Sequence, residues 1–139
     1  MEDQIRQKVI EDIENRGFNV INLGNGTFDL IIEGKRPYLV ELKIMKDSPR
    51  GFIEPDNFGF TFSNQQTMEI SKTKYPPIVL AFDMDSKRDK NHLLMPEWVK
   101  EETEGRLGFD TAILSTKFCD FPKPIKYSEL INKLLELIK

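Results

Sequence analysis

The N-terminal segment alternates between apolar and charged positions with the period of a helix. Ile5, Val9 and Ile13 recur at intervals of four residues, and charged residues occupy the other side. Gly17 follows the last periodic turn, as is common where a helix ends. The pattern therefore predicts a helix over residues 2–16.

The next stretch changes to short apolar runs that are rich in β-branched residues. These runs cover residues 18–23, 27–32 and 38–45. An Asn-Gly pair beginning at Asn25 separates the first two runs, and a Gly-Lys-Arg-Pro stretch beginning at Gly34 separates the second from the third. Strands joined by such tight turns pair side by side in opposite directions. We therefore predict a three-stranded antiparallel meander.

The rest of the chain predicts one more helix and one buried strand, followed by shorter elements. Residues 46–62 are irregular, Ser63 is a candidate N-cap for a helix reaching Lys74, and the apolar run 78–82 is typical of a buried central strand. The remaining expectations are a short strand or aromatic flap with alternating Phe58, Phe60 and Phe62, a strand at 93–95, a helix at 96–104, an edge strand at 112–114 and a final amphipathic helix capped by Ser128.

This order of elements predicts the fold class. A helix, three strands, a helix and a strand over about residues 2–83 indicate an α/β fold with a mixed central sheet flanked by helices. The 139 residues have the size of one ordinary domain, so we expect a single domain over 1–139 with one hydrophobic core. Residues 84–139 are an elaboration on that core, serving either as a dimer surface or as an element that grips the substrate.

Composition narrows the class of protein. With 39% apolar and 31% charged residues, no apolar run of bilayer-spanning length and no signal-peptide pattern, we expect a cytoplasmic protein without a membrane partner. Cys119 is the only cysteine, which excludes an intrachain disulfide and a cysteine-based zinc site. His92 is the only histidine and is expected on the surface, so a histidine metal site is not indicated.

The net charge of −3 is unusual for a protein that binds nucleic acid, because such proteins gain affinity by neutralising phosphates. Basic residues nevertheless gather in two clusters, within residues 35–50 and within residues 87–90. These clusters indicate either a basic face or ordinary solvated side chains. The charge therefore weakens a nucleic-acid interpretation without excluding it.

The third predicted strand carries charged residues on one of its two faces. Side chains alternate along a strand, so Glu41 and Lys43 share a face, and the apolar residues between them share the other. A hairpin at Gly34 brings Asp29 of the preceding strand near this pair. Charged groups among apolar neighbours are usually paired or hold a metal, and two converging carboxylates suit Mg²⁺, with Mn²⁺ as a substitute.

Such a site favours phosphodiester hydrolysis. The metal polarises a phosphate oxygen and acidifies a water molecule, and Lys43 orients that water or stabilises the charge that develops on the phosphate. The alternative is an exposed cross-strand ion pair on a solvent face. That alternative predicts a polar second face, whereas Leu39 and Met45 also lie on it.

Eleven residues separate Asp29 from the run Glu41-Leu42-Lys43. This pattern resembles the signature of the PD-(D/E)XK nucleases, whose core has the same order of elements. Over residues 2–83 the resemblance implies a restriction-endonuclease-like fold. It also implies a metal held by Asp29 and Glu41, assisted by the carbonyl of Leu42, with Lys43 as the catalytic lysine. One difference is that Phe28 stands where the signature has proline.

Many members of this family carry a glutamine on the helix after the third strand. This chain offers Gln65 and Gln66, and we favour Gln66 because Ile70, four residues on, anchors that side of the helix in the core; a pair of exposed glutamines is the alternative. Some members also use a glutamate of the first helix as an extra ligand. Three residues are available for that role, or as solvated charges: Glu2, Glu11 and Glu14.

The expected function is that of a Mg²⁺-dependent endonuclease acting on DNA as a homodimer, since two related sites can cut both strands of a duplex. Its size resembles that of the Holliday-junction resolvases and the small restriction or repair nucleases of the family. The alternatives are an RNA-directed nuclease or toxin, a catalytically silent module of the same fold that binds nucleic acid or protein, and an interaction protein in which the motif is accidental.

Overall fold

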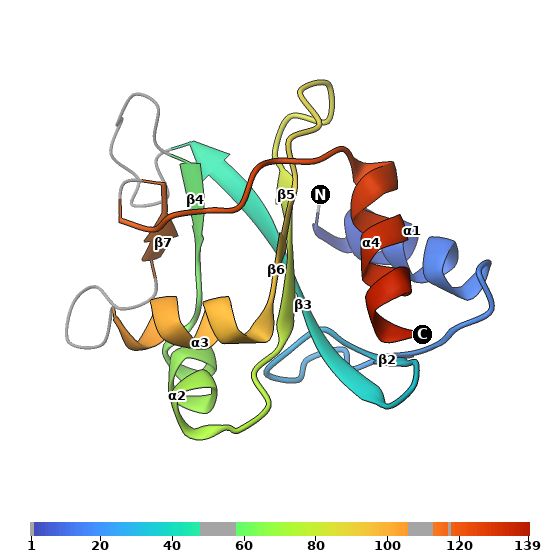
Figure 1. Ribbon diagram of the computed structural model, residues 1–139, viewed down its shortest axis with the longest axis horizontal. Helices are drawn as coiled ribbons and strands as arrows, with labels where there is room; N and C mark the ends of the chain where they lie inside the picture. The colour runs from blue at the N-terminus through green and yellow to red at the C-terminus, as the bar shows by residue number, and fades with distance from the viewer. Residues whose placement is uncertain (1, 48–57, 106–112, 117) are drawn as a thin grey trace.

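A computed structural model describes residues 2–47, 58–105, 113–116 and 118–139 (Figure 1). The helices are α1 (Glu2–Glu14), α2 (Asn64–Lys72), α3 (Pro96–Glu104) and α4 (Tyr127–Ile138). The strands are β1 (Asn19–Asn22), β2 (Leu30–Glu33), β3 (Pro37–Asp47), β4 (Phe58–Thr61), β5 (Ile78–Asp83), β6 (His92–Leu94) and β7 (Ile113–Ser115). The predicted order of a helix, three strands, a helix and a strand is confirmed. Between β3 and α2, β4 is the short strand expected at Phe58 and Phe60.

The sheet is mixed, as predicted, and β3 is its central strand. Strands β1, β2 and β3 form the expected antiparallel meander, with Leu30 opposite Val40. The long β3 then pairs in parallel with β5, from Val40 opposite Ile78 to Met45 opposite Asp83. Helix α2 lies in the chain between β3 and β5, as a parallel pair requires a crossover connection. The last residues of β3 pair with β4, β7 pairs with β4, and β6 pairs with β5.

Helices cover both faces of the sheet, so the molecule has two hydrophobic layers and not the single core we expected. Figure 1 shows α1 and α4 on one side of β3 and β5, and α2 and α3 on the other. The first layer includes Val9 of α1 and Leu134 of α4 against Val40. The second includes Ile70 of α2 and Met45 of β3. Alternate residues of β3 thus enter opposite layers.

Long-range contacts move three predicted features. The second strand begins at Leu30 and not at residue 27, because the side chain of Asp29 is bonded across to β3. Helix α4 begins before Ser128, at Tyr127, whose N–H donates to the carboxylate of Asp89 at 3.0 Å. His92 is buried in β6 and not at the surface, with Nδ1 lying 2.8 Å from the carbonyl oxygen of Pro122.

Other boundaries shift by a few residues. Helices α1 and α2 end at Glu14 and Lys72, each two residues before the predicted ends at 16 and 74. Two predicted positions lie outside the described residues. They are Arg50, at the end of the basic cluster within residues 35–50, and Ala112, at the start of the edge strand expected at 112–114. None of the helices in the described parts of the chain is long and apolar enough to cross a bilayer.

The C-terminal helix is integrated with the hairpin that carries the charged residues. The N–H of Lys35 donates to the carbonyl oxygen of Ile138 at 2.7 Å. A Cβ atom on Gly34 would lie 2.1 Å from the same oxygen, so only glycine permits this approach. Helix α4 therefore completes the layer beneath β2 and β3.

The variant Gly34→Ala should lower the free energy of unfolding by about 1–3 kcal/mol, the range seen for overpacking. The added methyl group must displace the end of α4 from the β2–β3 turn. Urea unfolding followed by circular dichroism measures this effect. Gly105→Ala is the matched control, because Gly105 has φ −64° and its Cβ would meet neighbours at ordinary distances of 3.5 Å or more. Equal unfolding midpoints for the two variants would show that α4 does not depend on the close approach.

Candidate functional site

Asp29 and Glu41 face each other where strand β2 begins. The N–H of Asp29 donates to Oε1 of Glu41 at 3.0 Å, and the N–H of Leu42 donates to Oδ2 of Asp29 at 2.9 Å. The regular ladder between β2 and β3 ends at Leu30 opposite Val40. Two carboxylate side chains thus replace the next backbone pairing, which fixes both of them against the backbone of the neighbouring segment.

Glu41 is a buried carboxyl group, only 3% exposed. Its burial, and after that its hydrogen bond with Asp29, raise its pKa from 4.5 to about 8, although the positive charge of Lys43 acts in the opposite direction. Burial of Glu41 excludes the alternative of an exposed ion pair. At neutral pH this carboxyl group gives up its proton readily only if further positive charge arrives.

Lys43 lies on the same face of β3 as Glu41. Its Nζ is 3.3 Å from Oε2 of Glu41 and 3.0 Å from Oε1 of Gln66. The ring of Phe62 lies beneath the ammonium group, with 5.2 Å from Nζ to the ring centroid. The alternation predicted for residues 38–45 is confirmed by these positions.

The amide of Gln66 links the site to helix α2. Its Nε2 donates to Oε2 of Glu41 at 2.5 Å and to the carbonyl oxygen of Thr27 at 2.8 Å. Its Oε1 accepts from Lys43 and from the N–H of Ser63, the latter at 3.1 Å. A glutamine amide has two donor hydrogens and an oxygen with two lone pairs, so this amide is fully bonded. Ser63 and Gln66 also form a capping box at the start of α2.

Gln65 differs from its neighbour. It is exposed, and its Nε2 donates to the hydroxyl oxygen of Thr27 at 3.0 Å. Of the two candidate glutamines, the structure thus brings Gln66 into contact with Glu41 and Lys43, and it places Gln65 at the rim.

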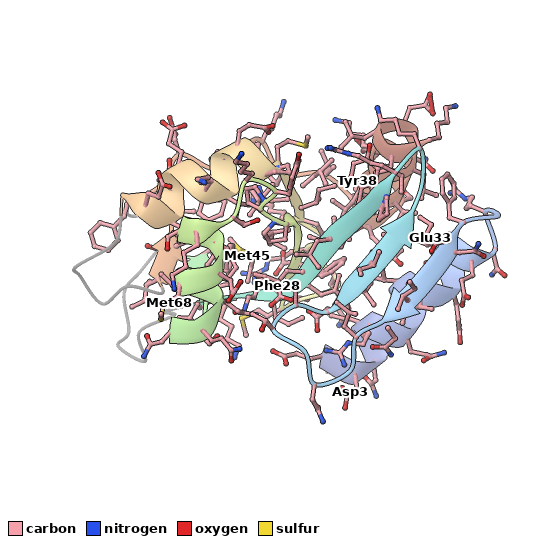
Figure 2. The ribbon with its side chains drawn as sticks, turned by 90° about the horizontal axis from the view of Figure 1, so that it is seen from below. Asp3, Phe28, Glu33, Tyr38, Met45 and Met68 are labelled. Atoms are coloured by element: carbon pink, nitrogen blue, oxygen red, sulfur yellow. The ribbon has the colours of Figure 1, made fainter. Side chains whose placement is uncertain are left out.

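A cleft of about 460 Å³ opens over these groups. All six predicted site residues line it, namely Asp29, Glu41, Leu42, Lys43, Gln65 and Gln66. Helix α1 adds Glu2 and Arg6 to the lining, whereas Glu11 and Glu14 are exposed elsewhere on that helix. A larger cavity, of about 800 Å³, lies beside α3 and contains none of the predicted residues. Figure 2, which labels Phe28 and Met45, views the sheet face that carries the cleft, with α2 beside β2 and β3.

Sequence reasoning missed Arg6, whose guanidinium Nη2 is paired with Oδ1 of Asp29. The only local signal is that Arg6 follows Ile5 at the border of the apolar stripe of α1. Many helices have such a border cation, so the pattern does not indicate the carboxylate it meets.

The donor set suits a hard cation that keeps part of its water shell. Among the described residues, no group of three or more His, Cys, Asp or Glu side chains is placed to hold a metal. Mg²⁺ often needs only one or two carboxylates, which Asp29 and Glu41 supply. Because a strand residue directs its N–H and its C=O to the same side, the carbonyl of Leu42 faces the side on which Asp29 lies. The predicted ligands therefore fit Mg²⁺.

Comparison with known proteins bears on the fold. No family model matches the chain, and no curated protein matches it. A solved structure that it resembles is that of the bacterial homing endonuclease I-Ssp6803I, with a TM-score of 0.50 and 14% identity over 97% of this chain and 90% of that chain. The fold is one that a nuclease uses. At this identity the likeness concerns architecture alone.

Replacing Gln66 by Ala should lower the free energy of unfolding by about 1–3 kcal/mol, because the buried carboxyl group of Glu41 and the partly buried carbonyl of Thr27 lose their partner. Thermal unfolding monitored by circular dichroism measures the effect. Gln65→Ala, a control at the exposed neighbour, should change stability by less than about 0.5 kcal/mol. Similar losses in both variants would mean that the amide network contributes little.

Stability without metal should decrease as pH rises from 4.5 to about 8, because over this interval the folded state holds a proton on Glu41 that the unfolded chain releases. The stabilisation is complete below pH 4.5 and lost above about pH 8. The variant Glu41→Gln should flatten this decrease, as measured by melting temperature in EDTA. Burial lowers the pKa of His92, which acts in the opposite direction at lower pH, but it does so equally in both proteins. Parallel pH profiles would contradict the prediction.

Proposed function

We propose that this chain is a metal-dependent endonuclease of the PD-(D/E)XK type that hydrolyses phosphodiester bonds in DNA. The observation that carries the proposal is the meeting of Asp29, Glu41 and Lys43 in one cleft, at the positions that the family signature assigns. The resemblance of the fold to that of a homing endonuclease agrees with it.

In this proposal Asp29 and Glu41 hold the cation, assisted by the carbonyl of Leu42. The chemistry supplied by bound Mg²⁺, or by Mn²⁺ in its place, is Lewis acidity toward a phosphate oxygen and toward a water molecule. A bound cation would favour the ionised form of Glu41, whose pKa is raised to about 8 without it, and would offset the negative charge that the two carboxylates place beside a phosphate. Cleavage should therefore depend strictly on the cation.

Lys43 is the cationic side chain that contacts Glu41. Glu41 and Gln66 hold its ammonium group in place, so its direction is set before a substrate arrives. An ammonium in this position donates to the attacking water or to a phosphate oxygen and stabilises the charge that develops there. Gln66 acts as a positioning residue, because it touches both Glu41 and Lys43.

The net charge of −3 does not attract nucleic acid, so the substrate must be bound by the individual basic groups in and near the cleft. The basic cluster at 87–90 is partly neutralised within the chain, since Nη2 of Arg88 lies 2.8 Å from Oδ1 of Asp83. Lys46 lines a small neighbouring cavity together with Glu2. A cytoplasmic homodimer, whose two clefts act on the two strands of a duplex, completes the proposal.

The test is a titration of Mg²⁺ and Mn²⁺ against plasmid, branched and single-stranded DNA, with RNA in parallel. Asp29→Ala should reduce cleavage to background, and Lys43→Ala should slow it on the order of 100-fold. Two exposed residues serve as matched controls that keep full activity: Asp120→Ala and Lys133→Ala.

Each of the other possible results would contradict the proposal in a different way. Cleavage that persists in both site variants would come from a contaminant. Cleavage of RNA alone would make the chain an RNA-directed nuclease. Binding of nucleic acid without cleavage in either metal would show a silent module of the same fold.

A further inference from the structure

Arg6 reaches from α1 into the cleft and occupies a carboxylate that the proposed function assigns to a metal. Its Nη2 is paired with Oδ1 of Asp29, and both side chains are largely covered, with 26% of Arg6 and 14% of Asp29 exposed. Two cationic groups cannot share this oxygen at close range, because their repulsion in a partly buried site is strong. Arg6 must therefore leave Oδ1 when a cation binds to that oxygen.

The ion pair is incomplete as a guanidinium site. Arginine binds an oxyanion best through two parallel N–H groups. Arg6 meets only Oδ1 of Asp29, whereas Oδ2 accepts the N–H of Leu42. The Nε of Arg6 is buried and has no hydrogen-bond partner among the described residues. The guanidinium thus retains a buried donor that Asp29 does not satisfy.

A phosphate offers what Asp29 lacks, namely two unesterified oxygens that match the guanidinium fork. Arg6, Asp29 and Lys43 line the same cleft, so a phosphate held there is within the surroundings of Arg6. We propose that Arg6 is a substrate-binding residue, which neutralises Asp29 in the free protein and transfers to a substrate phosphate when Asp29 binds the cation. The inference rests on the proposed function and adds a role for α1.

This exchange couples the two binding events. A phosphate that engages Arg6 releases Asp29 for the cation, and a cation on Asp29 releases Arg6 for the phosphate. By linkage, each ligand should raise the affinity for the other. A free cation would then bind weakly until substrate is present.

The test combines two measurements on Arg6→Gln, with Arg16→Gln as the matched control at an exposed position. Electron paramagnetic resonance of free Mn²⁺ gives the metal affinity without nucleic acid. Single-turnover cleavage at saturating Mn²⁺ gives the rate. Arg6→Gln should bind Mn²⁺ about fivefold more tightly, since a competing ion pair is gone, yet cleave about tenfold or more slowly. Arg6→Lys, which keeps the charge but not the fork, should lie between the two in both measurements.

The proposal expects Arg6→Gln to bind Mn²⁺ more tightly and to cleave more slowly. A merely structural role for Arg6 would instead weaken metal binding and cleavage together and lower the melting temperature in EDTA. Unchanged or weaker Mn²⁺ binding by Arg6→Gln overturns the exchange, and so does tighter binding with an unchanged rate. A wild-type protein that cuts no nucleic acid overturns the proposed function instead. The Mn²⁺ measurement then still decides whether Arg6 competes for Asp29, with Asp29→Asn as the background in which Arg6→Gln should have no further effect.

Discussion

The amide of Gln66 holds the start of α2, the segment before β2 and the charged face of β3 in one arrangement. Each of its hydrogen-bonding positions is used, by Glu41, Lys43, Ser63 and the carbonyl of Thr27. A buried amide bonded in this way has one favourable orientation, since turning it over would set donors against donors. The geometry of the cleft is therefore set by a residue that also takes part in the capping box of α2.

The charged groups lie where the regular sheet gives way to side-chain bonding. Beyond Leu30, carboxylates take over the role of backbone partners between the two chain segments. Such a cluster stabilises the fold poorly, because Glu41 is desolvated beside a second carboxylate. Sites of this kind are typical of function, where local stability is exchanged for reactive groups held in place.

Local pattern was enough to predict what lies along single strands and helices. The alternation around Glu41 placed it beside Lys43, and the apolar position of Ile70 singled out Gln66. Features that depend on distant segments were not predictable. The cap of α4 comes from Asp89, and the burial of His92 depends on a contact with Pro122. Arg6 reaches Asp29 only because α1 packs across the sheet, and nothing in its own surroundings in the sequence encodes that direction.

The contact between Ile138 and the β2–β3 turn has a consequence for biosynthesis. The layer beneath Val40 includes Leu130, Leu134 and Ile138, and the turn at Gly34 accommodates the final carbonyl of that helix. A nascent chain that has emerged only as far as β5 contains Asp29 and Glu41 but lacks the helix that packs beneath their strands. The layer that supports the cleft should thus close only after α4 has left the ribosome, so the groups of the cleft take up their places late in synthesis.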